Sequence, residues 1–152
     1  MTGTDDKGSL GDPFDLKRFT SAQEGVYGAA LAELKGGRKR SHWMWFIFPQ
    51  IDGLGFSATS RRYAIKSIRE ARAYLDHPVL GQRLKECAQA LLAVEGRSAS
   101  QILGYPDDMK LSSSMTLFAV AAEEPDSVFV RVLERYYGGE RDGATLRLLG
   151  EP

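Results

Sequence analysis

The sequence predicts an all-α fold, a compact single-domain helical bundle of about six to eight helices. Apolar residues recur at helical spacing in several consecutive segments, and these segments end at glycine or proline. Only residues 43–48 have a β-like composition, and one isolated strand would lack a pairing partner. The length of 152 residues suits one domain, because a domain of this size buries roughly 70% of the surface that its unfolded chain exposes.

Three helices are predicted in the first two thirds of the chain. The first begins at Thr20, a plausible N-cap, and ends at the glycine pair 36–37. A second follows residues 57–60, and the residue before Pro78 ends it. Pro78 suits the first turn of the third helix, which ends at Gly96. We expect the second and third helices to form a helical hairpin.

The last third of the chain predicts further helical segments. Ser98 is positioned to cap a short helix. A longer helix begins at Asp107 and stops before Pro125, and another follows and ends at the glycine pair 138–139. The apolar end at residues 146–149 is expected to dock back on the bundle.

The folded domain is predicted to span residues 13–150. Residues 1–12 contain three glycines and three aspartates, and Leu10 is their only large apolar residue after the initial Met. Such a segment can bury little surface, so we predict a disordered N-terminal tail over residues 1–12. The remaining sequence shows no internal repeat, low-complexity tract or long linker, which favours one domain.

Composition and charge exclude several classes of protein. Hydrophobic residues make up 43% and charged residues 26% of the chain, as in ordinary globular proteins. Lys plus Arg equals Asp plus Glu at 20 each, so no global positive field favours extended nucleic acid. Cys87 is the only cysteine, which excludes an intramolecular disulfide and suits a reducing compartment. With neither a signal peptide nor a long apolar stretch in the sequence, we expect a cytoplasmic location and no membrane partner.

Two long and unusual segments carry a family resemblance. They are SHWMWFIFPQ followed by GLGFS, within residues 41–57, and PDDMKLSSSMTLF at residues 106–118. Together they resemble the domain of unknown function 1810 (DUF1810) family, bacterial proteins that are sometimes mislabelled as calpastatin. The resemblance extends from about Phe14 to Leu149. It implies a mainly α-helical fold, in agreement with the periodicity, and it implies no established activity.

The aromatic segment 41–50 is the first candidate functional element. It concentrates both tryptophans, Trp43 and Trp45, beside the polar residues His42 and Gln50. Either the segment plugs the core, or one of its edges forms a pocket wall, where tryptophan stacks on a flat ligand and Gln50 supplies a directional hydrogen bond. His42 is a candidate acid–base catalyst because imidazole titrates near neutral pH, and its other interpretation is a hydrogen-bonded structural residue.

The glycine-containing loop at residues 52–60 is the second candidate. It leads into a helix that begins near Arg61, and free backbone N–H groups at a helix start attract anions. Ser57 and Arg61 would add donors for a phosphate or carboxylate. The alternative is an ordinary capped helix start with solvent-facing arginines. The spacing matches neither a Walker loop nor a dinucleotide fingerprint.

Polar residues also interrupt an otherwise apolar helix at Lys110 and Ser114, which are i, i+4 neighbours. A serine beside a lysine can act as a nucleophile with its base. More often such hydroxyls bond to the carbonyl four residues earlier and form a polar helix face. A basic cluster at Lys35 and residues 38–40 is either a solvated turn or lies against the aromatic segment.

Two functional hypotheses follow. The favoured one is a cytosolic domain that binds, and in one version transforms, a small anionic, nucleotide-like molecule. The alternative is a non-catalytic protein-interaction or scaffold module with an exposed aromatic edge, and a homodimer is left open. With two histidines and one cysteine in the chain, we predict no metal site, and we predict no cofactor. The candidate site residues are His42, Trp43, Trp45, Gln50, Ser57, Arg61, Lys110 and Ser114.

Overall fold

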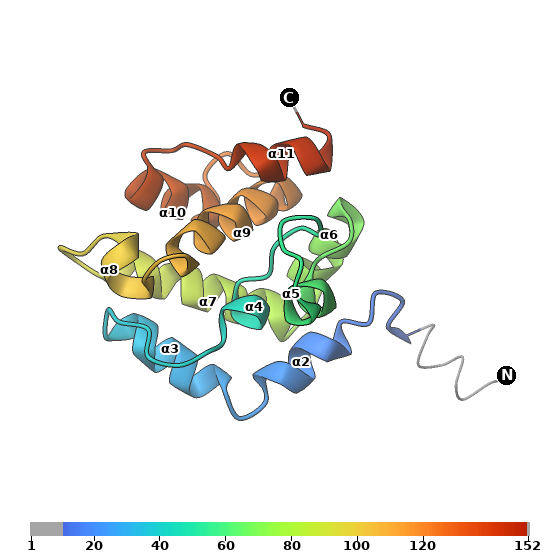
Figure 1. Cartoon of the computed structure of the whole chain (residues 1–152), viewed down its shortest axis with the longest axis horizontal. Coiled ribbons are helices and arrows are strands. Elements are labelled where there is room, and N and C mark those ends of the chain that lie inside the picture. The colour runs from blue at the N-terminus through green and yellow to red at the C-terminus, as the bar shows by residue number, and fades with distance from the viewer. Residues whose placement is uncertain (1–10, 152) are drawn as a thin grey trace, which may run out of the picture.

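The computed structural model describes residues 11–151, and every named element in them is a helix (Figure 1). The all-α prediction is therefore confirmed. The predicted disordered tail at residues 1–12 lies almost wholly outside the described residues. Within them, the Asp12 carboxylate accepts hydrogen bonds from the backbone N–H groups of Leu16 and Lys17, where the first named helix begins. The helices are α2 Lys17–Gln23, α3 Tyr27–Lys35, α4 Met44–Ile47, α5 Ala58–Tyr63, α6 Ile68–Asp76, α7 Leu80–Ala93, α8 Ala99–Leu103, α9 Asp107–Ala122, α10 Val128–Tyr137 and α11 Gly143–Leu149.

The described residues form more helices than the six to eight predicted, partly because two predicted helices are each broken in two. The first breaks between α2 and α3, where Gly25 has a φ of +75°. Thr20 lies inside α2 and does not cap it. The second is interrupted at residues 64–67, since Ile65 pairs with Ile51 in an isolated parallel bridge. Long-range pairing thus overrides the helical spacing at this point.

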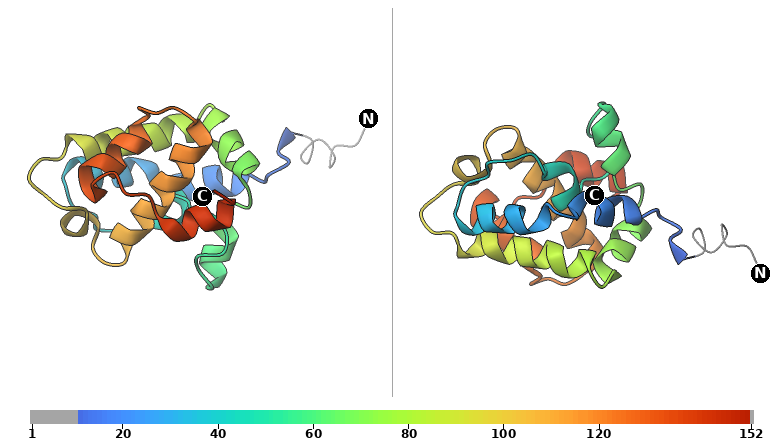
Figure 2. Two further views of the ribbon diagram at one scale, coloured as in Figure 1. Left: turned by 90° about the horizontal axis from the view of Figure 1, so that it is seen from above. Right: turned by 90° about the horizontal axis from the view of Figure 1, so that it is seen from below.

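Helix α9 is the central element of the bundle. It packs against α6, α8, α10 and α11, while α7 packs against α3, α6 and α10. Figure 2 shows α11 over α9 from above, and α3 beside α7 from below. Within residues 11–151, no helix has both the length and the apolar composition needed to cross a membrane.

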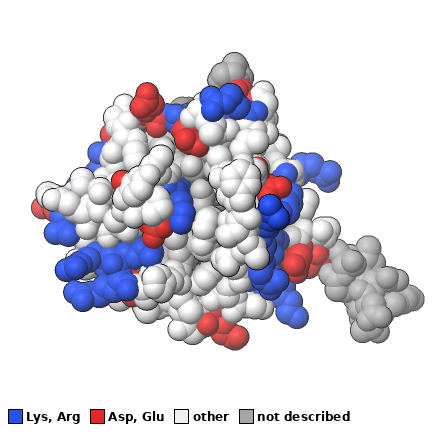
Figure 3. All heavy atoms as spheres, viewed as in Figure 1, with Lys and Arg blue, Asp and Glu red and all other residues white. Residues whose placement is uncertain are grey.

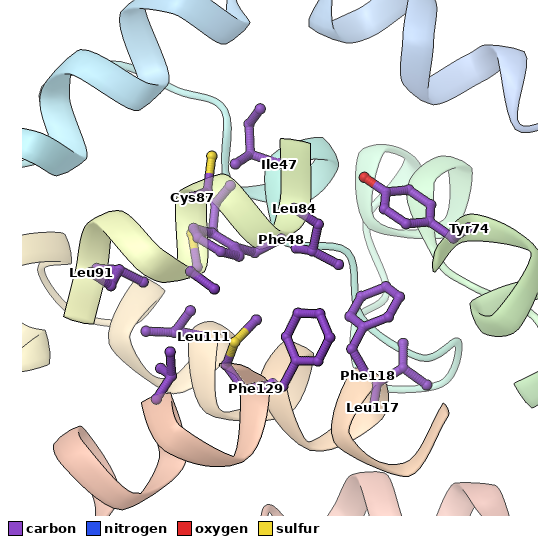
Figure 4. Close-up of a cluster of buried hydrophobic side chains, with 14 of the residues drawn as sticks. Ile47, Phe48, Tyr74, Leu84, Cys87, Leu91, Leu111, Leu117, Phe118 and Phe129 are labelled. Carbon is purple, nitrogen blue, oxygen red and sulfur yellow. The ribbon is translucent and has the colours of Figure 1, made fainter. Parts of the chain in front are cut away.

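Residues 44–47 of the aromatic segment form a short helix, α4, in spite of the β-like composition of residues 43–48. Trp43, Met44, Ile47 and Phe48 are buried, whereas Trp45 is only partly buried. This spacing is helical, so burial in the core selects the helix over the strand propensity of the aromatic residues. Figure 4 shows two of these side chains, Ile47 and Phe48, among core residues of α7 and α9.

The core also encloses the single thiol of the chain. Cys87 on α7 is fully buried, and its neighbours in Figure 4 include Leu84 and Phe48. Burial raises the pKa of the Cys87 thiol to about 12, although a hydrogen bond with Tyr27 opposes the shift. The thiol is therefore protonated in the folded protein at neutral pH.

The predicted helical hairpin is present as α6 and α7, and a glycine permits its close turn. A Cβ atom at Gly81 would lie 2.0 Å from the backbone oxygen of Leu75. No larger residue fits there unless the two helices move apart. The hairpin turn is completed by His77, whose Nδ1 accepts hydrogen bonds from the backbone N–H groups of Val79 and Leu80.

Candidate functional site

Trp45 and Lys110, which are far apart in the sequence, meet at the surface between α4 and α9. The ammonium nitrogen of Lys110 lies 4.1 Å from the centre of the Trp45 ring. This is a close cation–π contact, and the Lys110 side chain keeps 24% of its surface exposed. The face shown in Figure 3 is hollowed near its centre, between the first turns of α9 and the loop that precedes α5.

A small cavity lies beside the Trp45 ring. It is lined by Trp45, Gln50, Tyr63 and the loop at residues 51–55, and its volume of about 10 Å³ suits one water-sized group. The loop approaches the ring closely, because a Cβ atom at Gly55 would lie 3.7 Å from Cη2 of Trp45 and only 2.8 Å from the Ser60 side chain. Glycine at position 55 is thus needed for this close approach.

Gln50 brings an unpaired polar group to this cavity. The backbone of Gln50 is fixed, since its carbonyl oxygen accepts a hydrogen bond of 2.8 Å from the N–H of Ile65. Its side-chain Nε2, however, is buried without a hydrogen-bond partner. Among the described residues, the other buried side-chain polar atom without a partner is Oγ of Ser114. A buried N–H group that makes no hydrogen bond is costly, and the residue that carries this one lines the cavity.

Ser114 lies one helical turn beyond Lys110 on α9 and is fully buried. Its neighbour Ser113 behaves differently: Oγ of Ser113 donates to the carbonyl of Met109 and to Oδ2 of Asp142. Ser113 therefore makes the expected hydrogen bond to the carbonyl four residues earlier. Ser114 does not make this bond.

An ion-pair chain connects the site to the basic cluster. Nζ of Lys39 lies 3.0 Å from Oδ2 of Asp107, and Nζ of Lys110 lies 3.2 Å from Oδ1 of the same carboxylate. Lys39 also lies over the ring of Trp43, 5.1 Å from its centre. The cluster thus contacts the aromatic segment through Lys39. Sequence reasoning missed Asp107 as a site residue, although an acid three residues before a lysine on one helix is a usable signal.

Trp43 belongs to the core. Only 1% of its surface is exposed, and its indole nitrogen donates to Oε1 of Glu33. The Glu33 carboxylate also accepts hydrogen bonds from the backbone N–H groups of Arg40 and Ser41. With its ring buried and its N–H satisfied, Trp43 offers no face to a ligand.

Comparison with known families identifies the chain. The family model described as a protein of unknown function (DUF1810) matches residues 13–149. The chain belongs to the DUF1810 family. The resemblance expected from the two sequence segments is confirmed.

A solved structure supports the fold of this DUF1810 protein. The crystal structure of a conserved hypothetical protein from Mycobacterium tuberculosis is 54% identical to the chain, with a TM-score of 0.89. The match covers 93% of this chain and 100% of the other chain. A comparison with curated proteins finds no match.

The remaining candidates of the DUF1810 chain do not line the cavity. His42 is exposed. Ser57 is the N-cap of α5, where its Oγ accepts a hydrogen bond from the N–H of Ser60, and Arg61 is an exposed residue in the last turn of that helix. The structure therefore places Gln50 with Trp45 in the lining of the cavity and Lys110 over the Trp45 ring, and it leaves these three residues outside. Within residues 11–151, no three His, Cys, Asp or Glu side chains converge as metal ligands do, and the absence of a metal site stays a prediction.

Proposed function

We propose that this DUF1810 domain binds a small anionic molecule with a flat, nucleotide-like body, and that Trp45, Gln50 and Lys110 form the binding site. The observation that carries the proposal is the buried, unpaired Nε2 of Gln50 at a cavity beside a partly exposed tryptophan. An oxygen atom of a ligand would fill the cavity and accept the Gln50 hydrogen bond. It would thereby remove the cost of the unpaired group.

Lys110 and Trp45 supply the charge and the stacking surface. In the ligand-free protein, the ammonium of Lys110 rests on the Trp45 ring and pairs with Asp107. An anionic oxygen is a stronger partner for the ammonium than an aromatic face. Binding would therefore draw Lys110 off the ring and free the ring for a flat ligand.

The proposal is limited to binding. Ser114 is fully buried, and His42 does not line the cavity, so neither is placed to react with a molecule at Trp45. Chemical transformation of the ligand would need a further reactive group at the site. We retain the cytoplasmic location as part of the proposal, since the one cysteine of the chain suits a reducing compartment.

An interaction module is the second candidate function. Large apolar side chains are exposed at Phe56, Tyr105 and Met109, and such residues recruit protein partners or a second copy of the chain. A stable dimer in light scattering, lost in a Phe56→Ser Met109→Ser variant, would favour this candidate over the ligand site.

Thermal-shift screening against nucleotides, sugar phosphates and aromatic acids tests the ligand site. A ligand at a hundred times its Kd adds about 2.7 kcal/mol to stability, enough to raise the Tm by several degrees. The shift should disappear in Lys110→Gln and Gln50→Met and persist in Lys85→Gln, a matched change at an exposed lysine of α7. A shift that survives in Lys110→Gln and Gln50→Met, or no shift with any compound, would contradict the proposal.

A further inference from the structure

We infer that the ligand of the Trp45–Lys110 site carries a single negative charge, as a carboxylate on a flat apolar body, and is not a polyphosphate. This inference rests on the proposed function and specifies its ligand class. It draws on the charges around the site, the side chains that border it, and the size of the cavity.

The ion pairs at the site leave one positive charge. Lys39 and Lys110 share the carboxylate of Asp107, and Asp52, which lines the cavity, lies 3.5 Å from the ammonium of Lys66. Among the described residues, these ion pairs contain three ammonium groups and two carboxylates. The Lys39 side chain is only 9% exposed and already paired, so Lys110 is the cation within reach of a ligand on Trp45. One negative charge on the ligand balances this set, and further negative charges would be repelled by Asp52 and Asp107.

Apolar side chains border the site. The described residues contain five exposed large hydrophobic side chains; three of them lie on segments that form or adjoin the site, and a fourth, Leu148 of α11, lies against its loop. Phe56 follows Gly55, which approaches the Trp45 ring, and Leu148 lies against Gly53 of the same loop. The other two are Tyr105, which precedes α9, and Met109 in the first turn of α9, next to Lys110 in the sequence. Such a border favours an apolar ligand body over a ribose with several phosphates.

The serine donors at the start of α5 are already bonded within the chain. The backbone N–H of Ser60, in the first turn of α5, donates to Oγ of Ser57, and the hydroxyl of Ser60 donates to the carbonyl of Ser57. Polyphosphate sites need several free backbone donors and cations that converge. Two donors adjoin Trp45: the amide of Gln50, which lines the cavity with it, and the ammonium of Lys110 over its ring, and a carboxylate has one oxygen for each. One oxygen fits the cavity of about 10 Å³ at Gln50, and the other pairs with Lys110.

The test titrates ¹⁵N-labelled protein with three probes: naphthoate, its uncharged analogue naphthamide, and ADP. The two tryptophans give two indole N–H signals, and Trp45→Phe assigns them. Because the Trp43 N–H is bonded to Glu33 in the core, its signal reports an intact fold and serves as an internal control. Naphthoate should shift the Trp45 signal and leave the Trp43 signal in place.

Naphthoate should bind at least about tenfold more tightly than naphthamide, because one charge-assisted contact distinguishes them. ADP should bind more weakly than naphthoate. Lys110→Gln should abolish the preference for naphthoate over naphthamide, while Lys110→Arg and the control Lys85→Gln should keep it. Both the Trp43 signal and the Tm verify that each variant is folded.

Two results would overturn the inference and leave the proposed function standing. They are equal binding of naphthoate and naphthamide at Trp45, and tighter binding of ADP with a shift of the Trp45 signal. If none of the three probes moves the Trp45 signal in the folded protein, the inference is wrong together with its ligand site. An equal change in naphthoate affinity in Lys110→Gln and Lys85→Gln would also overturn the inference.

Discussion

The indole nitrogen of Trp43 donates a hydrogen bond to Oε1 of Glu33 over 2.9 Å. The same carboxylate accepts the backbone N–H of Arg40 at 2.8 Å and the hydroxyl of Ser41 at 2.7 Å. Burial alone would raise the pKa of Glu33, but these donors together lower it to about 2. Glu33 therefore ties the loop after α3 to the core as a carboxylate.

Glu33→Gln should destabilise the protein in a pH-dependent way. Since the pKa of Glu33 is lowered on folding, its contribution is present above its usual pKa of 4.5 and is lost as the pH falls through 2. For a partly exposed group we expect a loss of about 1 to 2 kcal/mol near pH 7. Urea unfolding at pH 7 and pH 3 measures it, with exposed Glu24→Gln as the control. A difference between wild type and Glu33→Gln that does not shrink at pH 3 would contradict this role.

The two tryptophans should differ in their contributions to stability. Trp43→Ala removes a fully buried ring and should cost about 3 to 5 kcal/mol. Trp45 is partly exposed, so Trp45→Ala should cost no more than about 2 kcal/mol. Chemical denaturation of both variants tests this. Equal losses would show that Trp45 is a core residue and would remove the physical basis of the ligand site.

Gln50→Met should stabilise the ligand-free protein. Methionine has nearly the volume of glutamine and replaces the buried, unpaired Nε2 by an apolar atom. We expect a gain of about 1 kcal/mol, measured by thermal or urea unfolding without ligand. A loss of stability would mean that the Gln50 amide is satisfied within the folded chain.

Two glycine-to-alanine changes should have opposite signs. At Gly81 a methyl group would meet the Leu75 carbonyl, so Gly81→Ala should cost about 3 kcal/mol or more as α6 and α7 are forced apart. At Gly28, exposed in α3, no atom lies within 4 Å, so Gly28→Ala should add about 0.5 to 1 kcal/mol. The pair is compared by thermal unfolding. A tolerated alanine at position 81 would argue against the close hairpin.

Ser113 and Asp142 should be energetically coupled. Oδ2 of Asp142 caps α11 by accepting from the N–H and the hydroxyl of Thr145, and Ser113 donates to the same oxygen. Asp142→Ala should cost about 1 to 2 kcal/mol. In a double-mutant cycle with Ser113→Ala, we expect a coupling energy of about 0.5 to 1 kcal/mol. Strict additivity of the two losses would show that the contact between the helices contributes nothing.

Helix ends that are determined by capping residues close in the sequence are predictable from the sequence. Ser98 caps α8 in a full capping box, α9 begins at Asp107, and Gly138 ends α10 in the left-handed conformation, all as expected. The elements that were predicted wrongly are determined by contacts between residues far apart in the sequence. The Ile51–Ile65 bridge interrupts a helix, and burial of Met44 and Ile47 in the core favours the helix in α4. Neither effect is visible in a local window.

Some residues of the candidate site were predictable from the sequence, but its geometry was not. Polar residues inside apolar segments single out Gln50, Lys110 and Ser114, and two of these carry the buried unpaired atoms. The contact of Lys110 with Trp45 and the sharing of Asp107 between two lysines depend on how α4 meets α9. That arrangement is set by packing of distant segments, which spacing along one helix does not encode.

Because Cys87, the only cysteine of the chain, is fully buried, the rate at which it reacts with an alkylating agent reports opening of the native state. A protonated, fully buried thiol reacts with alkylating agents only after α7 separates from its neighbours. The rate of alkylation therefore measures how often the native state opens, and no engineered reporter group is needed. Changes such as Gly81→Ala that loosen α7 should accelerate labelling before they alter the helical content, and a bound ligand should slow labelling in proportion to its occupancy.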